Sequence, residues 1–227
     1  MAERHLSGSA ERDYPRLMSP VVRPRRVHPT KVRLIEAVLQ MRKTQPYEAI
    51  TVENVLELSG VSRGSLYHHF TDFYDLIEAA ELVRFTKYVD VSIQRIIDMA
   101  SAAKTREDLV SGIQQITRET QSPAMAQIRM DRIAALARAQ GNPRFQKALA
   151  AEQERLTEAL AEVVVDAQVK GWFDRTIDPR AVAVFIQAYT LGRAIDEISH
   201  NEMDPEAWNA LIDRVIELAF VNPNLPQ

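Results

Sequence analysis

The placement of proline restricts this chain to a helical fold. No proline occurs between Pro46 and Pro123, and four later prolines each follow a residue that can cap a helix. A capping side chain accepts a hydrogen bond from a free amide at a helix start, and proline at the first helical position has no N–H to leave unpaired. The four pairs, each of which predicts a helix start, are Ser122-Pro123, Asn142-Pro143, Asp178-Pro179 and Asp204-Pro205.

The other local signals are helical as well. Thr105 with Asp108 has the pattern of a capping box, and no Asn-Gly turn or sustained apolar–polar alternation indicates a strand. The sequence predicts about nine helices, over residues 30–45, 51–58, 62–69, 72–100, 105–120, 123–140, 143–170, 179–199 and 205–220. We expect an all-α protein with a flexible basic arm over 1–29, a three-helix module over 30–75 and a larger helical domain over 76–227.

Composition excludes several classes of protein. Apolar residues make up 46% of the 227, enough for a packed core, and the absence of cysteine excludes disulfides and thiolate metal sites. The longest apolar run, residues 181–186, is far too short to span a membrane, and residues 1–29 contain no apolar block typical of a signal peptide. These features predict a soluble cytoplasmic protein.

The net charge of −3 conceals a basic segment near the N-terminus. Residues 16–45 hold eight basic side chains and one acidic one, Glu36, for a segment charge of +7. The basic residues are Arg16, Arg23, Arg25, Arg26, Lys31, Arg33, Arg42 and Lys43. Such asymmetry indicates a polyanion partner at this end, with a solvated tail as the alternative.

The stretch SGVSRGSLYHHFTD, residues 59–72, concentrates the polar chemistry. Its two histidines, His68 and His69, are adjacent, whereas chelation from one helix needs a spacing of three or four residues. Ser65 has helical spacing to both, but no strand–turn–helix surrounds it as a nucleophile would require. Neither glycine-rich phosphate motif occurs in the chain. We therefore expect no metal site, no catalytic residues and no cofactor.

The same stretch fits a helix-turn-helix. Residues 51–59 form an amphipathic helix, and Gly60 can adopt the positive φ that a tight turn between helices requires. Val61 would fill the angle between the helices, and Ser62 would cap the second one. An ordinary corner in a helical core is the alternative interpretation.

The second helix would display groups suited to a DNA groove. Its first turn presents Arg63, Gly64 and Ser65, with Tyr67 and His68 just beyond. Arginine can donate two hydrogen bonds to a guanine edge, and glycine lets the backbone approach closely.

Residues 34–80 resemble the DNA-binding domain of TetR-family transcriptional regulators. The specific part is Thr51-Val52, the run from Gly60 to Tyr67, then Phe70 and Asp75-Leu76. The resemblance implies a homodimer that represses by occupying an operator on double-stranded DNA and leaves when a small-molecule effector binds the larger domain. The chain departs from the family at Phe73, where lysine is usual, and at Arg42, where an aromatic residue is common.

The resemblance also implies roles for individual residues. Thr51 and Ser62 would contact phosphate, Arg63, Gly64 and Ser65 would face bases, and Tyr67 and His68 would touch backbone or base. In the basic segment, Arg23, Arg25 and Arg26 would reach the minor groove, and Lys31 belongs to the same DNA-binding set.

Two C-terminal segments predict a dimer. The helix over 179–199 is apolar on two faces, one of which carries Val184, Leu191 and Ile195, and the helix over 205–220 has a stripe with Trp208, Leu211 and Val215. Two such helices from each subunit would form a four-helix interface, with a thick monomeric core as the alternative.

A pocket for an apolar or amphipathic effector is expected among the helices over 72–100, 123–140, 143–170 and 179–199. The candidate lining residues are Met125, Met130, Trp172, Phe185 and Tyr189, with Arg129, Gln187 or Arg193 as polar contacts. Such residues are also typical of an ordinary core. Alternative functions are an activator, a DNA-binding protein that responds to another protein, and a helical small-molecule binder or enzyme that does not bind DNA.

Overall fold

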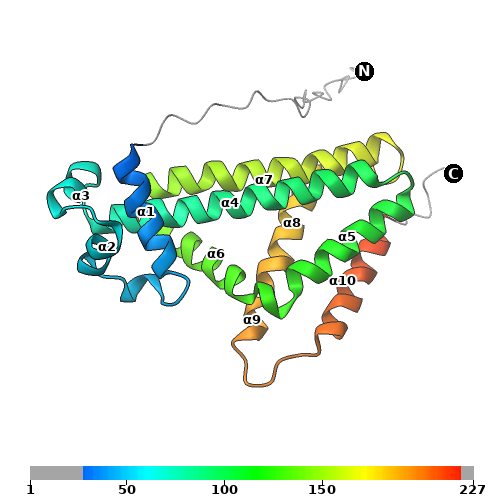
Figure 1. Cartoon of the computed structure of the whole chain (residues 1–227). Coiled ribbons are helices and arrows are strands. Elements are labelled where there is room, and N and C mark those ends of the chain that lie inside the picture. Colours follow the sequence, from blue (N-terminus) through cyan, green and yellow to red (C-terminus); the bar gives the residue numbers. More distant parts are fainter. Residues whose placement is uncertain (1–27, 221–227) are drawn as a thin grey trace, which may run out of the picture.

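The computed structural model describes residues 28–220, and the regular structure in that range is entirely helical (Figure 1). The α-helices are α1 (Pro29–Met41), α2 (Val52–Ser59), α3 (Arg63–His69), α4 (Phe73–Ala102), α5 (Arg106–Gln121), α6 (Ala126–Ala139), α7 (Pro143–Val169), α8 (Pro179–Gly192), α9 (Ala194–Glu197) and α10 (Pro205–Phe220). Short 3-10 turns occupy Tyr47–Ala49 and Pro123–Met125. The predicted all-α class is confirmed.

Most helix starts use the predicted caps. Thr105 and Asp108 form the reciprocal capping box of α5. The side chains of Asn142 and Asp178 accept hydrogen bonds from the first amides of α7 and α8. Ser122 is the exception, because its side chain makes no cap hydrogen bond and a 3-10 turn precedes α6. Local sequence therefore sets most of the helix boundaries.

The single helix predicted over 179–199 is wrong. The structure divides it at Arg193 into α8 and the four-residue α9. Gly192 has a low helix propensity, and the Thr190 hydroxyl donates to the Ile186 carbonyl one turn earlier, an interaction that bends helices. Arg193 keeps helical backbone angles, with φ −54° and ψ −33°, and α9 follows α8 at the lower side of the molecule (Figure 1).

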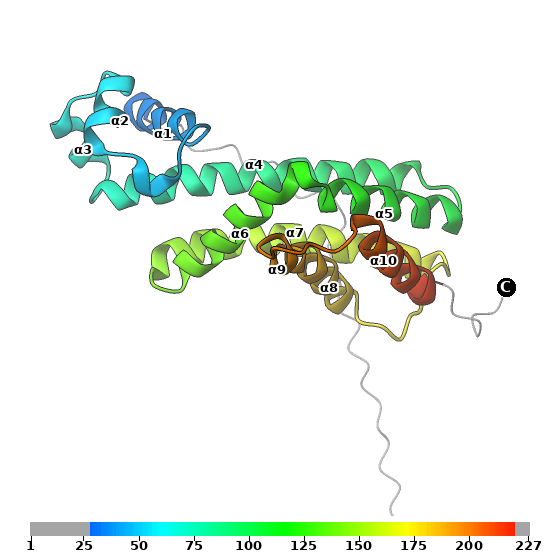
Figure 2. The ribbon, with the colours of Figure 1, turned by 90° about the horizontal axis from the view of Figure 1, so that it is seen from below.

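The N-terminal helices form a core of their own. Leu34 and Val38 of α1 pack with Val55 of α2, Leu66 of α3 and Leu76 of α4, all of them fully buried. The 30-residue α4 then runs from this module along the whole length of α7 (Figures 1 and 2). The module is thus joined to the larger helical part by a single continuous helix.

The larger part has two further core clusters. One lies between α4, α6 and α7 and includes Phe85, Val89 and Leu149. The other joins α5, α7 and α10 and includes Leu109 and Phe173. Within residues 28–220, no helix is both long enough and apolar enough to cross a membrane.

Candidate nucleic-acid interface and ligand cavity

The predicted turn between α2 and α3 is present. Gly60 ends α2 in the left-handed conformation, with φ 63° and ψ 22°. Val61 is buried beyond it, against the same core as Val55 and Leu66. The Ser62 hydroxyl accepts a hydrogen bond from the Ser65 amide and so caps α3. The turn geometry therefore follows from a positive-φ glycine, an apolar plug and a cap.

The polar face of α3 points away from this core. The Arg63 side chain is 55% exposed, and Gly64, Tyr67 and His68 are also exposed. A Cβ added at Gly64 would meet nothing within 4 Å, so the backbone there is open to an approaching molecule. The α3 helix lies at one end of the protein (Figure 1). Ser65 is half-buried, and its hydroxyl accepts a hydrogen bond from the Ser62 hydroxyl at 3.1 Å.

Arg63 has a partner in the preceding helix. Its guanidinium lies 2.5 Å from the Glu53 carboxylate of α2, and both side chains are well exposed. The Glu53 pKa is lowered by a hydrogen bond from its own backbone amide and by Arg63. Glu53 therefore holds Arg63 over the exposed end of α3, where solvent or another anion can replace it.

The predicted basic arm lies almost wholly outside the described residues, and so do Arg23, Arg25 and Arg26. The described chain begins beside α3, because the His28 and His69 rings lie 4.6 Å apart. Nearby, the Lys31 ammonium lies 4.9 Å from the centre of the Phe70 ring. No cluster of three or more potential metal-ligating side chains occurs within residues 28–220.

A cavity of about 510 Å³, partly open to solvent, lies in the larger helical part. Residues of α4 to α8 and of α10 line it, together with Tyr47 from the N-terminal module. Most of the wall is apolar, and its volume is in the range that holds a drug-sized ligand. Of the predicted lining residues, Met125, Phe185, Gln187 and Tyr189 face this cavity.

Four predicted lining residues lie elsewhere. Arg129 is fully buried but is occupied, since it pairs with Glu197 and donates to two backbone carbonyls. Trp172 packs in the core cluster of α5, α7 and α10, Met130 is exposed, and Arg193 is buried at the break between α8 and α9. Periodicity alone did not distinguish these positions from the cavity wall.

The cavity wall contains an ionic bridge to α1 that the sequence did not reveal. Asp131 of α6 lines the cavity, and one of its oxygens lies 2.5 Å from the guanidinium of Arg42, the residue that directly follows α1. Its other oxygen pairs with Arg84 of α4. Arg42 is one of the positions at which the chain departs from its expected family pattern. One carboxylate therefore connects the cavity to two helices that support the N-terminal module.

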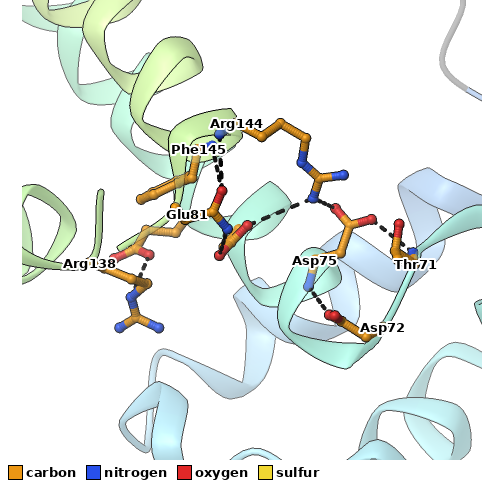
Figure 3. Close-up of polar contacts among 9 residues, drawn as sticks. Thr71, Asp72, Asp75, Glu81, Arg138, Arg144 and Phe145 are labelled. Atoms are coloured by element: carbon orange, nitrogen blue, oxygen red, sulfur yellow. Dashed lines mark hydrogen bonds and ion pairs between the residues drawn. The ribbon is translucent and has the colours of Figure 1, made fainter. Parts of the chain in front are cut away.

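A second set of contacts runs between the same parts (Figure 3). Arg138 of α6 pairs with Glu81 of α4 at 3.2 Å and lies 3.7 Å from Glu48 of the N-terminal module. Burial raises the pKa of the Glu81 carboxyl, and Arg138 opposes this shift. The guanidinium groups of Arg42 and Arg138 lie 5.2 and 5.8 Å from the centre of the Tyr47 ring.

The first turn of α4 is also tied to α7. Arg144 of α7 pairs with Asp75, as Figure 3 shows. The second Asp75 oxygen accepts a hydrogen bond from the Thr71 amide, and Asp72 caps the helix at the Asp75 amide. The helix that follows the candidate recognition helix therefore starts against the larger helical part.

A row of apolar side chains is open to solvent on α8, α9 and α10. Val184 is 50% exposed, Ile195 79% and Leu211 56%, and Leu191 is half-buried. The lower side of the molecule in Figure 1 is formed by α9, α10 and the loop that joins them. Further exposed members of the row are Ile198 and Leu218.

Two residues predicted for that face are turned inward. Val215 is half-buried and lines the cavity, and Trp208 packs against the core cluster of α5, α7 and α10. The apolar stripe of α10 is wider than one face of the helix. The residues at its inner edge therefore pack inside the subunit and are not available to a partner.

Comparison with protein families gives two separate matches, one in the N-terminal module and one in the larger helical part. Residues 34–80 match the family described as bacterial regulatory proteins, tetR family. Residues 116–221 match the family described as BetI-type transcriptional repressor, C-terminal. Together the two segments cover about two-thirds of the chain. No curated protein sequence matches it.

Solved structures share the fold at low sequence identity. A TetR-family transcriptional regulator from Mesorhizobium loti is 16% identical, with a TM-score of 0.62 over 83% of this chain and 93% of that one. GusR from Salmonella enterica is 20% identical, with a TM-score of 0.58 over 91% and 99%. A transcriptional regulator from Saccharomonospora viridis, solved with choline, is 14% identical, with a TM-score of 0.61 over 82% and 95%. With both family segments in one chain and this fold around them, the protein belongs to the TetR family of DNA-binding transcriptional regulators.

Proposed function

We propose that the protein is a homodimeric repressor that occupies a DNA operator and leaves it when a small molecule enters the cavity. The observation that carries this proposal is the position of Asp131, which lines the cavity and at the same time holds Arg42 at the end of α1. A ligand that moves this carboxylate changes the support of the DNA-binding module.

The DNA-binding step uses the exposed end of α3. Arg63 would donate to a guanine edge in the major groove, and Gly64 allows the close approach. Thr51 and Ser62, at the starts of α2 and α3, would contact phosphates together with free backbone amides. The arginines of the N-terminal arm would add electrostatic attraction.

Arg63→Ala should weaken operator binding by about 1–3 kcal/mol, because a bidentate contact to one base is lost. Binding to unrelated DNA should change much less. Deletion of residues 1–27 should instead weaken all DNA sequences similarly and flatten the dependence on salt. Fluorescence anisotropy with operator and unrelated duplexes measures both. An Arg63→Ala protein with wild-type operator affinity would show that α3 does not read bases through this side chain.

The release step depends on the bridge at Asp131. An effector changes operator affinity only if it binds the DNA-competent and the released conformations differently. Through Asp131 the cavity wall makes ion pairs with Arg42, at the end of α1, and with Arg84 of α4. The ion pair between Arg138 and Glu81 is a further link between α6 and α4.

Asp131→Asn should reduce the effect of the effector on operator affinity, because Arg42 and Arg84 lose their shared charge partner. Allosteric coupling energies are typically about 1–3 kcal/mol, or about 5- to 150-fold in affinity, and without the shared carboxylate we expect the release to fall to roughly twofold. Asp213→Asn is the matched control, since Asp213 pairs with Arg118 and is similarly buried but lies between α5 and α10. Equal effector responses in wild type and Asp131→Asn would contradict the coupling route.

The function itself is tested with DNA from beside the protein's own gene. Gel shift and footprinting should give a protected operator, and a reporter under that promoter should be silenced by the protein. An increase in reporter output would instead identify an activator. The ligand panel for release should include choline, because a regulator with the same fold was solved with it.

A further inference from the structure

The cavity contains a buried cation without an anionic partner. Arg132 of α6 lines the cavity and is only 4% exposed. Its Nη1 donates to the Tyr88 hydroxyl at 3.0 Å, and the guanidinium carbon lies 4.7 Å from the centre of the Tyr88 ring. Its Nε has no hydrogen-bond partner, and no carboxylate pairs with it among residues 28–220. Arg132 therefore retains unused hydrogen-bond donors.

Among the other charged groups of the wall, Lys87 has no ion-pair partner within residues 28–220, but it is exposed to solvent. The two carboxylates of the wall both form ion pairs: Asp131 pairs with Arg42 and Arg84, and Glu81 pairs with Arg138 at 3.2 Å. Arg95 pairs with Glu119 at 3.1 Å on the exposed rim. The cavity thus holds an unpaired buried cation but no free carboxylate for a cationic ligand.

Burial of this guanidinium opposes folding. Removal of a charge from water without an opposite charge is costly, and burial lowers the Arg132 pKa while Tyr88 counteracts the shift. Arginine nevertheless keeps its proton in proteins. Functional sites often keep residues that lower the stability of the ligand-free protein. The unpaired guanidinium of Arg132 is such a residue, and a bound anion would compensate its charge.

The remaining wall selects an apolar body for that anion. Aliphatic side chains of α4 to α8 and of α10 line the cavity, and they include Ile113, Ile116, Leu160, Val164 and Val182. Figure 2 shows α6 nearer the N-terminal module, with α5 and α10 toward the other end. A ligand with its charge at α6 can therefore extend its apolar part toward α5 and α10.

We propose that the effector is an amphipathic monocarboxylate, bound through Arg132 and Tyr88. The guanidinium offers donors for one carboxylate, and the Tyr88 hydroxyl accepts from Arg132 and keeps its own proton to donate. The proposal rests on the repressor function above, since it names the ligand class of the same cavity.

The observations disfavour a quaternary ammonium ligand. Such cations bind against open aromatic faces. The rings of Tyr88 and Tyr47 already have guanidinium groups near them, Arg132 at Tyr88 and both Arg42 and Arg138 at Tyr47. A cationic ligand beside Arg132 would therefore meet guanidinium groups, and both carboxylates of the wall are already paired.

Calorimetry on the full-length protein tests the proposal with three probes of one chain length: decanoate, decanol and decyltrimethylammonium. Decanoate should bind at least about tenfold more tightly than either of the others, because a charge-assisted hydrogen bond is gained. Arg132→Met should remove this preference and leave decanol binding nearly unchanged. The melting temperature of the ligand-free variant should equal or exceed that of wild type, because the unpaired charge is gone.

Arg95→Met is the matched control, since Arg95 also lines the cavity but is paired, and it should keep the preference for decanoate. If Arg132→Met fails to fold, Arg132→Lys replaces it in the experiment. This variant keeps the charge, and its preference for decanoate over the other two probes should be smaller than that of wild type. The proposal is overturned if decanoate does not bind, if the ammonium probe or choline binds more tightly, or if neither Arg132 variant reduces the preference. Decanoate that binds through Arg132 without a change in operator affinity would contradict the release mechanism and leave the ligand class intact.

Discussion

Ile195→Glu should convert the protein from a dimer to monomers and lower its operator affinity by at least about 100-fold. Ile195 and Ile198 are 79% and 75% exposed, and with Val184 and Leu211 they form the open apolar face of α8, α9 and α10. If two copies pair through this face, glutamate would place an unpaired charge in the interface of each subunit. Loss of the dimer would also end simultaneous binding to two half-sites, which supplies the large drop in affinity.

Sedimentation at micromolar concentration and operator anisotropy measure the two effects. Val169→Glu is the matched control, because Val169 is 71% exposed near the end of α7, away from this face, and that variant should remain a dimer with full affinity. An interface of this kind typically buries about 2,000 Å² or more in total. A monomeric wild type, or an Ile195→Glu dimer with wild-type affinity, would show that the face is not the interface.

The parts of the fold that sequence predicts well depend on neighbouring residues. The turn at Gly60, the Ser62 cap and the Thr105–Asp108 box are each formed within four residues. Backbone preference and cap hydrogen bonds fix them without reference to the rest of the chain. The exposed Arg63 follows in turn, because the cap and the buried Leu66 set which side of α3 faces outward.

Contacts between distant segments were not predictable in this way. Arg42 and Asp131 are 89 positions apart, and Arg129 and Glu197 are 68 apart. Helical periodicity shows that a charged residue lies on a given face, but which partner it meets depends on how helices cross. The sequence therefore predicts Arg129 at a ligand pocket, whereas in the structure Glu197 and two backbone carbonyls occupy its donors.

An apolar stripe on a helix can either pack inside the subunit or stay exposed on its surface. Leu211 and Val215 are one helical turn apart on α10, yet Leu211 is exposed and Val215 lines the cavity. When a stripe is wide enough to cover both a buried and an exposed face, the sequence does not show where the buried part stops and the exposed part begins. Met125 and Met130 differ for another reason, because Met125 ends the 3-10 turn before α6 and lines the cavity, while Met130 is exposed on α6 itself.

Glu197→Ala should lower the free energy of unfolding by about 3–5 kcal/mol, because it leaves Arg129 as an uncompensated buried charge. The Arg129 and Glu197 side chains are only 2% and 12% exposed, so solvent cannot replace the missing carboxylate. For a chain of this size the melting temperature should fall by roughly 6–20 °C. Arg129 keeps its hydrogen bonds to the Thr120 and Ser122 carbonyls, which favours the lower part of that range.

The pair also anchors the short helix that carries Ile195. Glu197 is the last residue of α9, so its loss should free α9 from α6 and weaken the proposed dimer. Because dimer formation itself raises apparent stability, the comparison should be repeated in the Ile195→Glu background. A fall in melting temperature that persists in the Ile195→Glu background is caused by the loss of the ion pair and not by the loss of the dimer.

Two further variants identify the cause of the effect. Glu154→Ala removes a well-exposed pair with Arg180 and should leave the melting temperature almost unchanged, since exposed pairs are screened by water. Arg129→Met combined with Glu197→Ala should recover much of the lost stability, because the buried charge is then absent on both sides. Differential scanning calorimetry at one fixed protein concentration compares all four proteins. If Glu197→Ala melts with the wild type, or if the double variant is less stable than Glu197→Ala, then the stability of this region does not depend on compensation of the Arg129 charge.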